Sequence, residues 1–216
     1  MSIVKLCGNR SEQDTRRSGQ SDATHLGFIF VEGTKRNVAA EEVGRWVDRI
    51  QPVQKLAGVF VEPSTAQVAE VLKHVPLDII QLHGNETVSE VLKMKETFAV
   101  DVWKAIHHDG HGQEKMELFR GTVDGYVIDA KVKGAHGGTG VTFDWEAVPA
   151  YVKTAKEQQV PCLIAGGITP ANVAEVLAFH PDGVDVSSGT ETNEAKDETK
   201  IYTLVKEVAN HAARIS

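Results

Sequence analysis

The feature that most constrains the fold of this chain is a regular alternation between short apolar runs and longer, helix-compatible segments. The runs are apolar on both faces, which is typical of strands in a buried parallel sheet. We expect eight strands, at residues 3–7, 24–30, 56–61, 77–82, 100–106, 125–129, 160–165 and 184–187. The intervening segments predict helices at residues 11–18, 40–50, 64–73, 88–96, 113–119, 145–157, 170–179 and 199–215.

Eight strand–helix units with right-handed crossovers close naturally into a (βα)8 barrel of the TIM type, with a parallel eight-stranded sheet. The length fits, because 216 residues with 41% hydrophobic content can bury one substantial core. The competing architecture is an open Rossmann sheet, which usually carries GxGxxG after its first strand. Here the first turn reads CGNRSEQ and the glycine-rich turns come late. We therefore expect one α/β barrel domain over residues 1–216.

Composition and charge argue against several classes of function. The formal net charge of -7, without a block of basic residues, argues against a nucleic-acid partner. No apolar run approaches the roughly 18 residues that span a bilayer, and the N-terminus lacks the apolar stretch of a signal peptide. Cys7 and Cys162 lie too far apart in sequence to suggest a zinc site or a disulfide framework. We expect a soluble cytoplasmic protein without a membrane partner.

Two strand ends carry reactive side chains. In this fold the functional groups stand at the carboxyl ends of the strands. Alternation places Cys7 on the same side as Lys5, and Asp129 on the same side as Val127. If those sides face inward, a thiol and a carboxylate face the same barrel mouth. The alternative is that Cys7 is a buried filler and Asp129 merely starts a turn.

Glycine-rich turns after the last three strands predict a phosphate site. They contain residues 137–140, Gly166 with Gly167, and Ser188 with Gly189. The loops after strands seven and eight are the usual phosphate cradle of this fold, where backbone N–H groups and a helix N-terminus neutralise the dianion. Ordinary turns are the alternative reading. We expect a phosphorylated small molecule as ligand.

The sequence leaves the roles of several other polar residues open. The histidines of the polar loop at residues 107–114 lack the helical spacing of a zinc enzyme, so we expect no metal site. His83, which ends the segment IIQLHG, is either a rim histidine or a substrate contact. Lys5 and Asp185, on the neighbouring first and last strands, form either an internal ion pair or part of a binding site. The acidic segment at residues 191–198 is expected to be a loop.

Eight segments, spread over nearly the whole length, share the pattern of one family. They are VKLCG (4–8), LGFIF with KRNV (26–38), AGVFVE (57–62), IIQLHG (79–84), WKA (103–105), VIDAKVKGAHGGTGVTFDW (127–145), LIAGGITPANV (163–173) and GVDVSSGTE (183–191). Together they resemble phosphoribosylanthranilate isomerase, the Amadori-rearrangement enzyme of tryptophan biosynthesis. The resemblance implies a (βα)8 barrel that uses no cofactor. It also implies a substrate with a 5'-phosphate and an anthranilate carboxylate, and we expect a monomer.

The resemblance also implies roles for individual residues. Cys7 would be the general base, Asp129 the general acid, and Arg36 the group that holds the anthranilate carboxylate. His83 and Asp185 would line the sugar. The phosphate would be bound at Gly138, Gly166, Gly167, Ser188 and Gly189.

The implied reaction converts N-(5'-phosphoribosyl)anthranilate to 1-(2-carboxyphenylamino)-1-deoxyribulose 5-phosphate. The base must be a thiolate, so we expect Lys5 or nearby helix N-termini to lower the pKa of Cys7. One rival is another phosphate-binding barrel, such as indoleglycerol-phosphate synthase, which would show a lysine and a glutamate at strand ends. A second rival is a catalytically silent phospho-sugar-binding barrel, which would lose the acid or the base. Cys7 and Asp129 are both present, which favours the isomerase.

Overall fold

A computed structural model of the chain describes residues 2–129 and 145–215. Its eight parallel strands form a closed barrel in chain order, and β1 is hydrogen-bonded to both β2 and β8. The strands are β1 (Ile3–Leu6), β2 (His25–Ile29), β3 (Lys55–Phe60), β4 (Ile79–Leu82), β5 (Asp101–His107), β6 (Gly125–Asp129), β7 (Cys162–Ala165) and β8 (Gly183–Val186). The predicted α/β barrel is confirmed.

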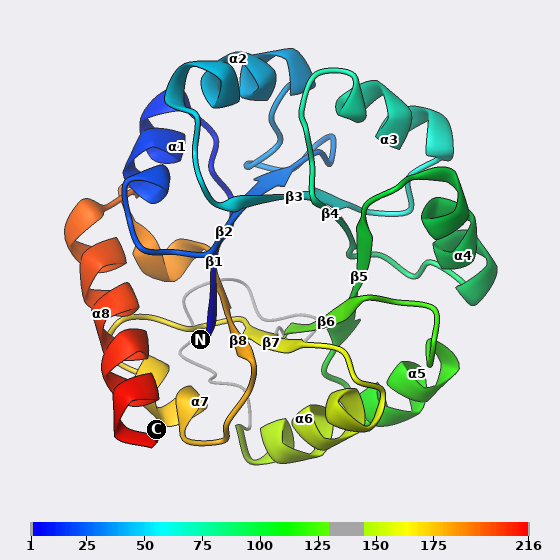
Figure 1. Cartoon of the computed structure of the whole chain (residues 1–216), viewed down its shortest axis with the longest axis vertical. Coiled ribbons are helices and arrows are strands. Elements are labelled where there is room, and N and C mark those ends of the chain that lie inside the picture. The colour runs from blue at the N-terminus through cyan, green and yellow to red at the C-terminus, as the bar shows by residue number, and fades with distance from the viewer. Residues whose placement is uncertain (1, 130–144, 216) are drawn as a thin grey trace.

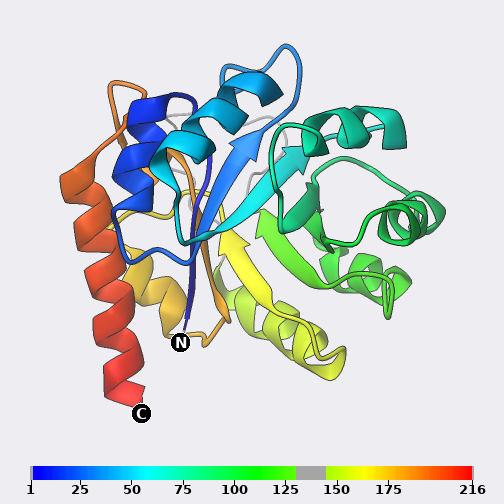
Figure 2. The ribbon, with the colours of Figure 1, turned by 45° about the horizontal axis from the view of Figure 1, so that its top comes forward.

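Helices surround the ring of strands (Figure 1), and the strands run toward the same end of the barrel (Figure 2). The helices are α1 (Glu12–Gly19), α2 (Ala40–Ile50), α3 (Thr65–Leu72), α4 (Val88–Thr97), α5 (Gly112–Leu118), α6 (Val148–Glu157), α7 (Val173–Leu177) and α8 (Glu198–Ile215). In the parts of the chain that the structure describes, none of these helices is long and apolar enough to cross a membrane.

Side chains alternate between the barrel interior and the layer beneath the helices. The interior cluster consists of Ala57, Ile79, Trp103, Ala105, Val127, Leu163 and Ala165. A larger cluster, which includes Ile80 and Ile128, packs between the strands and the helices. Ile3 packs against the interior cluster, so the two-residue repeat of a strand turns Lys5 inward as well. Val127 places Asp129 inward in the same way, as predicted.

Local signals explain several helix boundaries. The Ser11 side chain accepts a hydrogen bond from the Asp14 backbone N–H and so caps the N-terminus of α1. Thr87 and Glu90 form a capping box at the start of α4. The helix predicted at 145–157 begins instead as a 3-10 turn, Trp145–Ala147, and α6 follows with a proline in its first turn. Proline is tolerated there because its missing N–H would have no partner in the helix.

The acidic segment before α8 is not the plain loop that we expected. Two short strands, β9 (Glu191–Thr192) and β10 (Ala195–Lys196), pair as an antiparallel hairpin. The two residues between them, Asn193 and Glu194, have φ angles of 49° and 63°. Positive φ at both central positions is what a tight two-residue hairpin requires. The hairpin therefore folds Lys196 back toward Glu191.

Candidate active site

A cavity of about 340 Å³ opens at the carboxyl ends of the strands. Within the described ranges, every predicted site residue lines it: Cys7, Arg36, His83, Asp129, Gly166, Gly167, Asp185, Ser188 and Gly189. Gly138 lies outside the described residues. Residues that are far apart in the sequence are thus brought together at one mouth, as the barrel topology requires.

Cys7 follows β1 directly and lies in the cavity wall. Its backbone N–H donates to the carbonyl of Val186, which fixes it between β1 and β8. Gly27 on β2 leaves room for the thiol, because a Cβ there would lie 2.7 Å from the Cys7 Sγ.

The electrostatic surroundings of Cys7 differ from our expectation. Burial raises the pKa of the Cys7 thiol, and Asp185 raises it further, whereas Lys5 and Lys196 act in the opposite direction. The net direction is upward. The expectation of a lowered pKa is therefore wrong for the ligand-free site, because desolvation of the thiolate outweighs the nearby ammonium groups.

An ion pair lies beside the thiol. Lys5 Nζ donates to Asp185 Oδ2 at 2.8 Å, and the two side chains are 0% and 7% exposed. Burial works to lower the pKa of Lys5, but Asp185 and Cys7 together raise it above its ordinary value. The second oxygen of Asp185, Oδ1, is buried without a hydrogen-bond partner among the described residues. The pair predicted between the first and last strands is confirmed, and it leaves one acceptor in the cavity wall.

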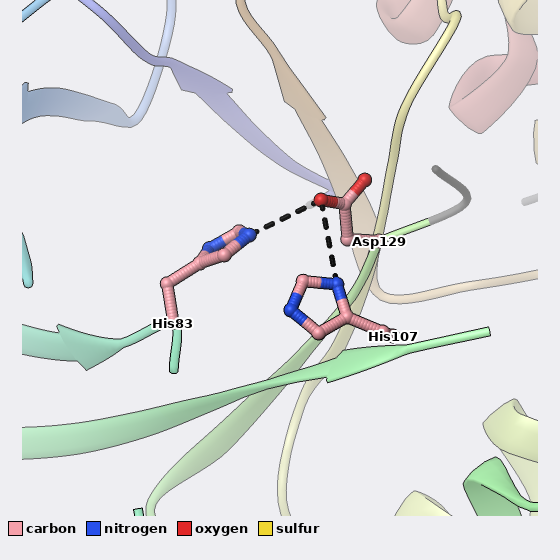
Figure 3. A group of neighbouring side chains, drawn as sticks. All are labelled: His83, His107 and Asp129. Atoms are coloured by element: carbon pink, nitrogen blue, oxygen red, sulfur yellow. Dashed lines mark hydrogen bonds and ion pairs between the residues drawn. The ribbon is translucent and has the colours of Figure 1, made fainter. Parts of the chain in front are cut away.

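Two histidine rings point toward the Asp129 carboxylate (Figure 3): His83 follows β4 directly, and His107 ends β5. His83 Nε2 lies 3.1 Å from Asp129 Oδ2, and His107 Nδ1 lies 3.8 Å from the same oxygen. Gln81 Nε2 lies 3.1 Å from His83 Nδ1. A neutral imidazole that donates its Nε2–H to Asp129 leaves Nδ1 to accept a hydrogen bond from the Gln81 amide nitrogen. Burial lowers the pKa of His107, which favours its neutral form.

These three side chains are also where a cation could bind. Among the described residues, His83, His107 and Asp129 are the group whose ligand atoms converge, all lying within 4.8 Å of one another. Two imidazole nitrogens and a carboxylate oxygen suit a divalent transition metal. The hydrogen bond between His83 and Asp129 places a proton between two of the atoms that would have to bind the cation. Our prediction that the site uses no metal stays a prediction.

Arg36, in the loop after β2, has its guanidinium paired with a carboxylate of the protein itself. Its Nη2 donates to Glu191 Oε2 at 2.8 Å and its Nε to Glu191 Oε1 at 3.2 Å. Lys196 Nζ lies 3.5 Å from Glu191 Oε1. Arg36 also lines the cavity, so it joins the hairpin to the site.

The loops after β7 and β8 meet at their glycines. A Cβ on Gly189 would lie 1.8 Å from the carbonyl oxygen of Ile168, so the two backbones are in direct contact. Gly166 and Gly167 have φ angles of 89° and 68°, a region that favours glycine. A Cβ on Gly167 would meet nothing within 4 Å. This backbone lines one side of the cavity.

Comparison with known proteins agrees with this geometry. Residues 4–207 match the family described as N-(5'phosphoribosyl)anthranilate (PRA) isomerase. The chain belongs to this family. The enzyme of that name from Geobacillus thermodenitrificans is 49% identical over 211 residues, which cover 97% of this chain and 95% of that protein. The Bacillus subtilis enzyme is 39% identical over 213 residues, which cover 99% of this chain and 97% of that protein.

Solved structures of the family share the fold. The crystal structure of phosphoribosyl anthranilate isomerase from Thermotoga maritima superimposes with a TM-score of 0.85 at 30% identity, covering 97% of this chain and 100% of that one. Another structure of the enzyme holds reduced 1-(o-carboxyphenylamino)-1-deoxyribulose 5-phosphate. It superimposes with a TM-score of 0.82 at 28% identity and covers the same shares, 97% and 100%. The predicted family, the fold and the isomerase activity in tryptophan biosynthesis are confirmed, and a phosphorylated small-molecule substrate is supported.

Sequence reasoning missed four residues around the site of this isomerase. Gln81 and His107 contact His83 and Asp129, and Glu191 and Lys196 form the chain of charges behind Arg36. We had placed His107 in a polar loop, but it ends β5 and faces inward. Strand alternation could have found it, since Ala105 and Trp103 lie two and four residues before it and line the interior.

Proposed function

We propose that this chain carries out the Amadori rearrangement of N-(5'-phosphoribosyl)anthranilate with Cys7 as the general base and Asp129 as the general acid. The observation that carries the assignment is a thiol and a carboxyl group, from β1 and β6, in the wall of one cavity. One positioned acid and one positioned base are sufficient for this isomerisation.

The proposed reaction proceeds in three steps. Asp129 gives a proton to the furanose ring oxygen, the bond between that oxygen and C1' breaks, and the ring opens to a Schiff base. The Cys7 thiolate then takes the proton from C2', which yields an enolamine. The enolamine accepts a proton at C1' from the Cys7 thiol and loses its 2'-hydroxyl proton to the Asp129 carboxylate, so it becomes the ketone and both groups return to their starting forms. No external oxidant or reductant is consumed, because the net change moves the hydrogen of C2' to C1' and the 2'-hydroxyl proton to the former ring oxygen.

The neighbours of the two groups support these roles. The His83 ring nitrogen lies within hydrogen-bond distance of the Asp129 carboxyl group and helps to fix its orientation in the cavity. Lys5 and Lys196 favour the thiolate of Cys7 electrostatically, although burial opposes them. The base is therefore a thiol in the resting enzyme, and only a minor fraction is ionised at neutral pH.

The rest of the cavity supplies groups for binding the substrate. The unpaired Oδ1 of Asp185 can accept a hydrogen bond from a sugar hydroxyl. Arg36 offers a planar fork to the anthranilate carboxylate. Backbone N–H groups at Gly166–Gly167 and Ser188–Gly189 would hold the phosphate, as glycine-rich turns and helix N-termini do elsewhere.

We also propose that the enzyme works as a cytoplasmic monomer, with no nucleic-acid or membrane partner and no cofactor. The formal net charge of -7 supports the absence of a nucleic-acid partner.

The test is a fluorescence assay that follows the loss of phosphoribosylanthranilate with no added metal or cofactor. Cys7→Ala and Asp129→Asn should each lower kcat by about 10²-fold to 10⁴-fold with little change in KM. Cys162→Ala is the matched control, since Cys162 is a buried β7 cysteine that packs in the cluster beneath the helices. A Cys7→Ala variant within about threefold of the parent, a difference under roughly 1 kcal/mol, would return Cys7 to the role of core filler.

A further inference from the structure

We infer that Glu191 is a positioning residue for recognition of the substrate carboxylate. It holds one edge of the Arg36 guanidinium, so that the other edge is available to a carboxylate bound in the cavity. The inference rests on the proposed role of Arg36 and adds a residue that does not touch the substrate. Its evidence is a continuous set of contacts from the buried Lys196 through Glu191 to Arg36.

The contact between Glu191 and Arg36 uses a defined part of the guanidinium. Nε and Nη2 donate to the two carboxylate oxygens in a bidentate pair. A guanidinium has five N–H groups in a rigid plane, so the Nη1 side stays available. Nη1 has no hydrogen-bond partner among the described residues. Gly8 lies close beneath the stem, since a Cβ there would lie 2.8 Å from Arg36 Cδ.

Glu191 is itself held on several sides. Lys196 Nζ lies 3.5 Å from its Oε1, and Ser187 Oγ donates to the same oxygen at 3.4 Å. Lys200 Nζ donates to its backbone carbonyl at 2.6 Å. The side chain is 7% exposed. Burial works to raise the pKa of Glu191, but Arg36 and Lys196 lower it below its ordinary value, so the carboxylate is ionised at neutral pH.

Lys196 gives this arrangement a fixed end inside the protein. Its side chain is fully buried, and its Nζ donates to the Ser187 carbonyl at 3.0 Å and to Thr190 Oγ1 at 3.1 Å. The tight turn between β9 and β10 is what returns it to Glu191. A buried ammonium needs a carboxylate nearby, because a lone buried charge is costly. Glu191 therefore cannot swing away without leaving Lys196 without a counter-ion.

The opposite role for Glu191 is a competitor that occupies the substrate's place on Arg36 and leaves when substrate binds. The contacts favour positioning, because release would separate Glu191 from both Lys196 and Arg36. The two roles predict opposite changes in the KM when the Glu191 carboxylate is removed. Loss of a competitor lowers the KM, whereas loss of a positioning group raises it.

The experiment compares Glu191→Gln with the parent on two substrates, phosphoribosylanthranilate and the N-phosphoribosyl derivative of aniline, which lacks the carboxylate. We expect the KM for phosphoribosylanthranilate to rise about tenfold or more with kcat within about threefold, since a charge-assisted bidentate contact is weakened. The KM for the aniline derivative should stay the same. Glu194→Gln is the control, because Glu194 lies in the same hairpin but pairs at the surface with Arg10 and Lys35.

A lowered KM would overturn the inference in favour of a competitor. An equal rise for both substrates would overturn it in favour of a general structural role. If Glu191→Gln fails to fold, Glu191→Asp, which keeps the charge but shortens its reach, should still raise the KM selectively for the carboxylate substrate. Arg36→Lys separates the two proposals. If Arg36→Lys changes the KM only for phosphoribosylanthranilate and Glu191→Gln changes neither KM, the role of Glu191 is rejected and that of Arg36 stands. If Arg36→Lys leaves the KM of both substrates as in the parent, the role of Arg36 is rejected.

Discussion

At the scale of single residues, the notable group is the Cys7 thiol, which is buried next to an ammonium group and is nevertheless harder to ionise than an ordinary cysteine. Lys5 is directly paired with Asp185, so its ammonium group stabilises the Cys7 thiolate less than an unpaired ammonium group would. The proposed base is thus mainly a neutral thiol at neutral pH, which makes it less reactive toward oxidants and alkylating agents, since the thiolate is the reactive species.

The raised pKa predicts where the thiolate will form. Below its pKa Cys7 is a neutral thiol, so we expect the ultraviolet absorbance of its thiolate to grow only above the ordinary cysteine pKa of about 8.5. A reaction that needs a thiolate and a protonated carboxyl together keeps a constant active fraction between the two pKa values. The profile of kcat/KM should therefore be flat near neutral pH and fall where the thiolate appears. Cys7→Ser should lack the absorbance change, and a thiolate signal already present at neutral pH would contradict the prediction.

At the scale of elements, the loops after β7 and β8 form one unit because Gly189 touches the Ile168 backbone. The glycines in these two loops have different tasks. Gly189 permits a backbone contact, whereas Gly167 keeps open space at the cavity wall.

Alanine at these glycines should separate the two tasks. Gly167→Ala has room for its methyl group but must adopt positive φ, so it should cost about 1–2 kcal/mol of stability and raise the KM by projecting into the proposed phosphate site. Gly189→Ala should lower the melting temperature more, because its methyl overlaps a carbonyl. Gly121→Ala is the control: it has the same positive φ and open surroundings, but lies outside the cavity lining. An unchanged KM in Gly167→Ala would place the phosphate elsewhere.

The elements show which features the sequence could predict. Strand β6 and helix α2 have the predicted bounds, because apolar periodicity is a local property of the chain. The hairpin at Glu191–Lys196 was missed because two residues per strand are too few to display a period. The raised pKa of Cys7 was missed for another reason: burial depends on the packed barrel, while the charge of Lys5 is visible in the sequence. The placement of the strand-end residues around one cavity was thus predictable, and charge networks across loops were not.

At the scale of the whole molecule, the Lys5–Asp185 pair joins the first and last strands where the barrel closes. Lys5→Met would leave Asp185 buried without its counter-ion, so we expect a loss of about 3–5 kcal/mol in the free energy of unfolding, measured in denaturant. Lys73→Met, which removes a partner of the exposed Glu70, should have a much smaller effect. Equal losses in both variants would mean that the closure does not depend on this pair.

His25 should make the stability of the molecule depend on pH. Burial lowers its pKa to about 4, whereas an unfolded chain takes up this proton near pH 6.5. The unfolded state therefore binds more protons between these values, and the free energy of unfolding should fall as the pH is lowered from about 6.5 to about 4. The full contribution is about 3 kcal/mol. The measurement is the difference between parent and His25→Gln across that window, and parallel curves would show that His25 is not the group responsible.

The missing side chain at Gly27 has a consequence for protein engineering. The sulfur of Cys7 occupies the volume that a methyl group on Gly27 would take. A designer who grafts this cysteine onto the first strand of another barrel must therefore also graft a glycine onto the neighbouring second strand. The proposed base thus depends on two positions twenty residues apart, and a library that varies only the first of them would miss it.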